Sequence, residues 1–115
     1  MKQVIVVRRD LKMRRGKEIS QGAHASLKAT LDYIDHPYVK EWLADIFTKI
    51  GVYVDSEKEL LELYDRVSND SVIPCSLIRD NGQTEFKGVD TYTAVAVGPA
   101  PRNMIDEFTG HLKLR

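Results

Sequence analysis

The sequence holds a single cysteine, Cys75, among its 115 residues. A lone cysteine cannot form a disulfide within the chain, and it cannot supply the several thiolates of a cysteine-based zinc site. No set of histidines, cysteines and carboxylates has the spacing typical of metal ligands. The sequence therefore predicts a protein of a reducing compartment that uses no metal ion and no cofactor.

Long apolar runs are absent as well. The longest uncharged stretch, residues 91–101, is far shorter than the roughly 20 residues that a membrane-spanning helix needs. The apolar start of the chain, residues 4–7, is too short for a signal-peptide core of about 7–15 residues. We expect a soluble, cytoplasmic protein that does not contact a membrane.

What the chain does contain is typical of a small globular protein. Hydrophobic residues make up 43% of the sequence and charged residues 30%, which excludes a disordered or fibrous protein. A chain of this length buries about two-thirds of its unfolded surface, which is enough for one core. We therefore expect one domain spanning residues 1–115.

The net charge is zero, but the charges are unevenly placed. Residues 1–30 hold eight basic and two acidic residues, whereas residues 31–110 hold seven basic and fifteen acidic ones. The basic residues are densest in residues 8–17. A basic patch on an acidic body is typical of an anion or nucleic-acid site, although a merely solvated loop would have the same composition.

The pattern of apolar residues predicts alternating strands and helices. Strands are expected at 3–8, 47–54, 72–78 and 91–97, and helices at 17–34, 38–44, 56–67 and 101–108. In the first helix, the spacing predicts an apolar face made of Ile19, Ala23, Leu27, Thr30, Leu31 and Ile34. Gly98 and Pro99 are expected to end the last strand.

This alternation predicts an α/β fold with a mainly parallel sheet, covered on both faces. The last two strands have no helix between them, so that pair can be antiparallel. Ligands bind beyond the carboxyl ends of strands in such sheets. This rule selects residues 8–17, 55–56 and 79–84 as the functional edge.

Polar side chains of the first helix point toward this edge. At 100° per residue, Lys17, Gln21, His24 and Lys28 form one stripe beside the apolar face. Asp80 and Thr84 follow the third strand. An amine, an amide, a carboxylate and a hydroxyl in one crevice can bind phosphate, orient water and stabilise an oxyanion. A packing role for His24 and a simple turn at residues 80–82 are the structural alternatives.

Three blocks of sequence resemble a known family. Residues 9–17 (RDLKMRRGK), followed by Gln21 and His24-Ala25, resemble the opening signature of the archaeal/eukaryotic-type peptidyl-tRNA hydrolases, the Pth2 family. Residues 78–84 (IRDNGQT) resemble its second motif, and residues 97–101 (VGPAP) with 109–114 (TGHLKL) resemble its ending. The blocks occur in order and cover nearly the whole chain.

The resemblance implies a three-layer α/β/α sandwich around a four-stranded mixed β-sheet, often in a homodimer. It also implies hydrolysis of the ester between a peptide and the 3′ ribose of tRNA. The implied catalytic residues are Lys17, Asp80, Thr84, Gln21 and His24. The basic residues expected to contact tRNA are Arg8, Lys12, Arg14, Arg15 and Lys113.

The sequence departs from the family pattern at Arg9, Ser20 and Asn81, none of which is an implied catalytic residue. Two other functions stay open on sequence grounds. One is a module of the same fold that binds tRNA or another RNA without cleaving it. The other is a hydrolase of a different acyl ester or amide.

Overall fold

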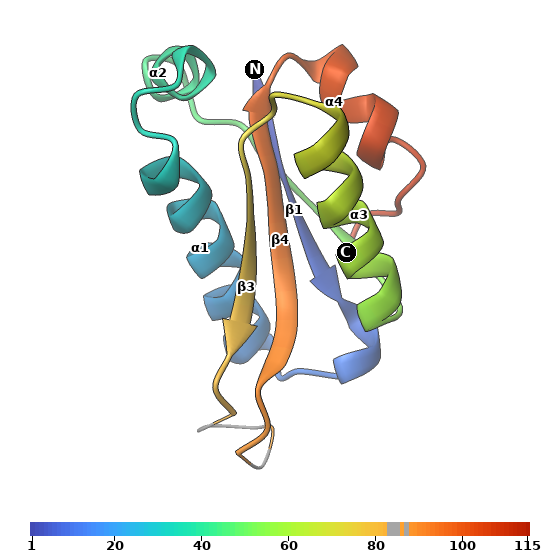
Figure 1. Ribbon diagram of the computed structural model, residues 1–115. Helices are drawn as coiled ribbons and strands as arrows, with labels where there is room; N and C mark the ends of the chain where they lie inside the picture. Colours follow the sequence, from blue (N-terminus) through green and yellow to red (C-terminus); the bar gives the residue numbers. More distant parts are fainter. Residues whose placement is uncertain (83–85, 87) are drawn as a thin grey trace.

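The computed structural model describes residues 1–82, 86 and 88–115 (Figure 1). Its strands are β1 (Lys2–Arg8), β2 (Lys49–Val54), β3 (Cys75–Asp80) and β4 (Thr91–Ala100). Its α-helices are α1 (Arg15–Asp32), α2 (Pro37–Leu43), α3 (Glu57–Asp70) and α4 (Arg102–Thr109), and a 3-10 turn, η1, spans Arg9–Leu11. Each expected strand and helix is therefore present, within a few residues of its expected bounds.

The sheet is mixed, with strand order β2-β1-β4-β3. Only β1 and β2 are parallel, whereas β4 is antiparallel to both β1 and β3. The expectation of a mainly parallel sheet is therefore wrong, and the four-stranded mixed sheet is confirmed. The reason is that β4 follows β3 without a crossover helix, so it runs back between β3 and β1.

Helices cover both faces of the sheet, giving the three-layer α/β/α sandwich (Figure 1). Helix α1 lies on one face, against β4, β3 and β1, and α3 and α4 lie on the other. Ser56 caps α3, because its hydroxyl accepts a hydrogen bond from the Glu59 N–H at 3.1 Å. In the described part of the chain, no helix has the length and apolarity to cross a membrane.

The buried face of α1 differs from the one expected. Its buried residues are Gln21, Gly22, Ala25, Ser26 and Ala29, whereas Ile19, Leu27, Leu31 and Ile34 are 44–72% exposed. The helix lies close to the sheet, where Ala25 and Ala29 pack against Ala94 and Ala96 of β4. Small side chains fit that narrow interface, so the large ones point outward.

Strand β4 continues past Gly98 to Ala100, so the expected break is wrong. Gly98 adopts φ +101°, where a Cβ atom would lie 2.7 Å from Ile105 Cδ1 and 2.8 Å from the Lys2 carbonyl oxygen. Glycine therefore lets the strand pass close to its neighbours. Strand β3 begins at Cys75 rather than at residue 72, after Pro74.

The carboxyl ends of β1, β2 and β3 lie at one edge of the sheet. Arg8 pairs with Val54 at the ends of the parallel strands, and Asp80 at the end of β3 pairs with Thr91 at the start of β4. The expected functional segments therefore meet at one end of the molecule, the lower end in Figure 1.

Candidate active site

An ion pair between α1 and β3 forms the centre of the site. Lys17 lies in the first turn of α1 and Asp80 is the last residue of β3. The Lys17 Nζ donates to Asp80 Oδ1 at 2.8 Å, and the two side chains are only 11% and 12% exposed. Residues that are 63 positions apart in the sequence thus form a shielded pair.

Asp80 is ionised because its neighbours stabilise the negative charge. Burial by itself would raise the pKa of the carboxyl, but the hydrogen bonds from Lys17 and the Gly82 N–H and the charges of Lys17 and His24 outweigh it. The pKa of Asp80 therefore lies below its ordinary value of 3.8. Such a carboxylate accepts hydrogen bonds well and is a weak base.

Gly82 fixes the other oxygen of this carboxylate. Its N–H donates to Asp80 Oδ2 at 2.9 Å, and its φ is +78°. A Cβ atom at this position would lie 2.5 Å from the Val89 backbone nitrogen. Only glycine satisfies both the positive φ and the close approach of backbone.

Gln21 extends the site one turn along α1. Its Nε2 lies 3.5 Å from Asp80 Oδ1, and its Oε1 accepts a hydrogen bond from the Thr93 hydroxyl at 2.6 Å. Gln21 is 2% exposed and Thr93 is fully buried. The Thr93 hydroxyl therefore orients the Gln21 amide so that its N–H groups face Asp80.

A β-bulge directs Thr93 toward α1. Ile78 pairs with Ala94 and Arg79 pairs with Tyr92, so Thr93 is an extra residue in β4. Ala94 packs beside Ala25 of α1, and Thr93 also reaches α1, so both point to the same face of the sheet. Thr93 is not predicted from the sequence as a site residue, because no local pattern indicates a bulge inside an apolar strand.

The other predicted catalytic residues have different placements. His24 is exposed, and its Nε2 lies 3.4 Å from the Ser20 hydroxyl. Its charge acts on Asp80 through space and lowers the pKa of that carboxyl. Thr84 lies outside the described residues, so its proposed role stays a prediction. Phe86, a residue missed by the sequence analysis, has its ring centroid 5.6 Å from Lys17 Nζ.

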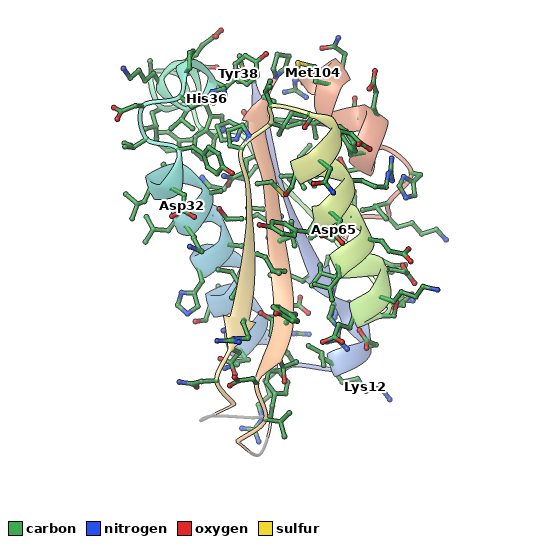
Figure 2. The ribbon with its side chains drawn as sticks, in the orientation of Figure 1. Lys12, Asp32, His36, Tyr38, Asp65 and Met104 are labelled. Carbon is green, nitrogen blue, oxygen red and sulfur yellow. The ribbon has the colours of Figure 1, made fainter. Side chains whose placement is uncertain are left out.

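The predicted tRNA-contacting residues divide into an exposed and a buried group. Lys12, Arg14 and Arg15 are exposed: the first two lie between η1 and α1, and Arg15 is the first residue of α1. Figure 2 shows Lys12 at the lower end of the molecule, where β3 ends. Lys113 is exposed on the C-terminal segment beside β2, where its carbonyl oxygen accepts from the Tyr53 N–H at 3.2 Å.

Arg8, by contrast, is 8% exposed. Its guanidinium donates to both carboxylate oxygens of Asp10 and to the Tyr92 carbonyl oxygen at 3.0 Å. Its donors are therefore used within the fold, and a phosphate would have to displace Asp10. Of the residues predicted to contact tRNA, Lys12, Arg14, Arg15 and Lys113 therefore present their charges at the surface.

The site combines three groups of complementary chemistry. An ionised carboxylate accepts hydrogen bonds, an ammonium group provides positive charge, and exposed basic residues lie beside them. Among residues 1–82, 86 and 88–115, no cluster of histidine, cysteine and carboxylate side chains has the arrangement of a metal site. The described residues can thus orient a water molecule and stabilise developing negative charge next to a polyanion.

Comparisons with known proteins match this chain over its whole length. A family model described as "Peptidyl-tRNA hydrolase PTH2" matches residues 1–115. The chain is 46% identical over 116 residues to a peptidyl-tRNA hydrolase of Methanocaldococcus jannaschii, with 99% of each chain covered. It is 42% identical over 115 residues to one of Thermococcus onnurineus, covering 98% of this chain and 96% of the relative. It is 43% identical over 114 residues to one of Halobacterium salinarum, covering 99% of each.

Proposed function

The chain belongs to the peptidyl-tRNA hydrolase PTH2 family, whose activity is ester hydrolysis, and we propose how its site carries that reaction out. Asp80 accepts a hydrogen bond from a water molecule and aims it at the carbonyl carbon that joins the peptide to the tRNA 3′ ribose. Its lowered pKa suits this orienting role better than strong general-base catalysis. The observation that carries the proposal is the shielded Lys17–Asp80 pair.

Lys17 supplies the positive charge of the mechanism. Attack by water turns the carbonyl oxygen into an oxyanion, and the bond to the ribose oxygen then breaks. An ammonium group beside Asp80 stabilises the oxyanion or the leaving oxygen. Water provides one proton for the ribose hydroxyl, and the peptide leaves with a new carboxyl group. We propose that the Thr84 hydroxyl helps Asp80 to hold the water molecule. Gln21 positions the Asp80 carboxylate.

The tRNA is bound through charge in this proposal. Lys12, Arg14 and Arg15 lie next to the catalytic pair and would contact backbone phosphates, with Lys113 at the flank. Phosphate contacts carry little sequence information, which suits an enzyme acting on many tRNAs. We expect it to act in the cytoplasm, where translation leaves its substrate.

We also propose that the protein forms a homodimer through an exposed apolar surface. This surface consists of Ile19, Leu27, Leu31, Leu43 and Phe47, which are 40–72% exposed. Leu27, Leu43 and Phe47 also line a hollow of about 440 Å³ beside α1. Contiguous exposed apolar side chains of this kind are typical of an interaction site.

The test of the proposed function compares two substrates. The protein is incubated with N-acetyl-aminoacyl-tRNA and with free aminoacyl-tRNA, and the release of tRNA is followed. We expect cleavage of the N-acetylated substrate alone. Binding of either without cleavage would instead support an RNA-binding module, and equal cleavage of both would support a less selective ester hydrolase.

A further inference from the structure

Strand β3 has one long side that faces away from the sheet, because it is the last strand in the order β2-β1-β4-β3. The Pro74 carbonyl oxygen points to β4, where it accepts from the Gly98 N–H at 2.7 Å. The Cys75 carbonyl oxygen points the other way, because it accepts from the Tyr33 hydroxyl at 3.4 Å. Backbone groups alternate in direction along a strand, so the N–H and C=O of Leu77 also face outward.

A groove runs along this outer side of β3. Its volume is about 530 Å³, within the range of about 300–1,000 Å³ common for ligand sites. Lys28 and Asp32 of α1, with Tyr33 just after the helix, form one wall, and Tyr64 of α3 forms the other. Cys75, Ser76 and Leu77 of β3 form its floor.

The strand and the helix that line the groove both continue toward the catalytic pair. Its floor strand ends at Asp80, and its α1 wall continues the stripe of Lys28, His24, Gln21 and Lys17 toward the same carboxylate. The far end is held by hydrogen bonds: Asp32 accepts from the Ser76 hydroxyl at 3.0 Å and pairs with Lys28 at 3.0 Å. The edge of β3 lies beside α1 along its length (Figure 1).

We propose that the peptide part of the substrate binds in this groove as an added strand along β3. The proposal rests on the proposed function, which places the ester carbonyl beside Asp80. The peptide's carboxyl end then lies at the end of β3 and its earlier residues lie toward Cys75, so peptide and strand run parallel. At about 3.3 Å per residue, the stretch from Ser76 to Asp80 accommodates about four peptide residues.

This mode of binding explains how one site accepts peptides of any sequence. An added strand is held by hydrogen bonds between main chains, which every peptide except one rich in proline can form. The tRNA and the peptide would then occupy opposite sides of the Lys17–Asp80 pair. The basic segment holds the tRNA, and the β3 edge holds the peptide.

The first experiment measures how the rate depends on peptide length. N-acetylated oligoalanyl-tRNAs with one to six alanines are compared by kcat/KM. Each productive main-chain hydrogen bond is expected to raise kcat/KM about 2- to 10-fold, with a plateau at about four residues. A flat series with normal cleavage of the shortest substrate would overturn this proposal and leave the proposed function intact. A series in which no member is cleaved would overturn both.

A second experiment identifies the hydrogen bonds and leaves the protein unchanged. Single N-methyl groups are placed in turn along the tetra-alanyl substrate. Methylation of amides that face β3 should lower kcat/KM about 2- to 10-fold, and methylation of the alternate amides that face away should have no effect. An equal effect at all positions, or no effect at any, would contradict an added strand.

Variants at Leu77 complete the test. Leu77→Pro removes an outward N–H without removing a bond to β4, as proline is tolerated on that side of an edge strand. It should reduce the gain in kcat/KM between the one-alanine and the four-alanine substrate about 2- to 10-fold relative to Leu77→Ala. Leu77→Ala is the matched control, since it shortens the same side chain and keeps the N–H. If Leu77→Pro does not fold, the N-methyl series by itself tests whether the peptide binds as an added strand.

Discussion

Lys17 and Asp80 illustrate how burial and pairing set the state of a functional side chain. Both are nearly enclosed, where an unpaired charge would be costly. Their mutual hydrogen bond and the Gly82 N–H keep the carboxylate ionised despite its burial. Because the two charges are held in place before substrate arrives, little reorganisation is needed during the reaction.

Removal of either charge should slow the chemical step. Lys17→Ala and Asp80→Ala are expected to lower kcat for N-acetyl-aminoacyl-tRNA about 10²–10³-fold, as for other preorganised electrostatic groups. Circular dichroism should show a retained fold. Lys40→Ala on α2, at the other end of the molecule, is the control and should keep the normal rate. Near-normal turnover in either site variant would remove that residue from the mechanism.

The pKa of Asp80 also predicts a pH dependence of stability. A carboxyl whose pKa is lower in the folded than in the unfolded state stabilises the fold fully above its unfolded value. This contribution is lost as the pH falls below about 3.8 toward the folded pKa. Urea unfolding should therefore show that Asp80→Asn is less stable than the parent protein at pH 7, with a difference that shrinks below pH 4.

Lys17→Met is the companion variant for that measurement. Without the ammonium group, burial raises the Asp80 pKa with less opposition. The loss of stability on acidification should then be smaller than in the parent protein, because it is confined to the interval between the unfolded and the folded pKa of Asp80. The same pH profile in both proteins would show that Lys17 does not hold the carboxylate ionised.

At the scale of the elements, the bulge in β4 joins the sheet to the site. It brings Thr93 to the α1 side, where its hydroxyl holds the Gln21 amide. The same strand then continues with small residues against α1, so the helix stays close to the sheet. One extra residue in β4 therefore sets both the position and the direction of the amide beside Asp80.

Loss of the Thr93 hydroxyl should affect both stability and rate. In Thr93→Val the buried Gln21 Oε1 loses its donor, which costs about 1–3 kcal/mol of unfolding free energy. The freed amide can also turn away from Asp80, so we expect kcat to fall about 10-fold. Thr93→Ser keeps the donor and should recover most of the rate. A stability loss without a rate loss in Thr93→Val would make Thr93 purely structural.

At the scale of the whole molecule, exposed basic residues gather at one end of the sheet. The basic segment with Lys12, Arg14 and Arg15 lies at the end where β3 stops, beside the catalytic pair. The rest of the chain, residues 31–110, has an excess of acidic residues. Exposed basic residues beside the catalytic pair attract a polyanion to that end of the molecule.

The salt dependence of tRNA binding tests that arrangement. Replacing Arg14 and Arg15 with alanine should weaken binding and flatten the plot of log K against log salt by about 0.7–0.9 for each lost phosphate contact. Lys40→Ala removes one positive charge at the opposite end and should leave the slope unchanged. An unchanged slope in the double variant would exclude these arginines from the interface.

The apolar surface beside α1 predicts self-association. Leu27 is 58% exposed near its centre, so Leu27→Glu should convert a dimer to a monomer. Analytical ultracentrifugation measures the change. Val72→Glu, at a residue 70% exposed outside this surface, is the control and should keep the dimer. A parent protein that sediments as a monomer at all concentrations would contradict the dimer itself.

The local patterns of the sequence were enough for most of the fold. Apolar runs and their periodicity predicted the strands and helices, because these signals act over a few residues. The break expected at Gly98 and Pro99 was wrong, because pairing with β1 carries β4 on to Ala100. The motifs also placed Lys17, Gln21 and Asp80 at one edge, since the carboxyl ends of parallel strands meet there. The basic segment was visible from composition alone.

Tertiary structure decided which side of each helix or strand is buried and which side is exposed. Helix α1 has two faces, and only its distance from the sheet determines that Ala25 and Ala29 are buried while Ile19 and Leu27 are exposed. The bulge at Thr93 and the outward edge of β3 depend on which strands become neighbours. Pairing of distant segments is not encoded in any local period, so these features follow only from the folded molecule.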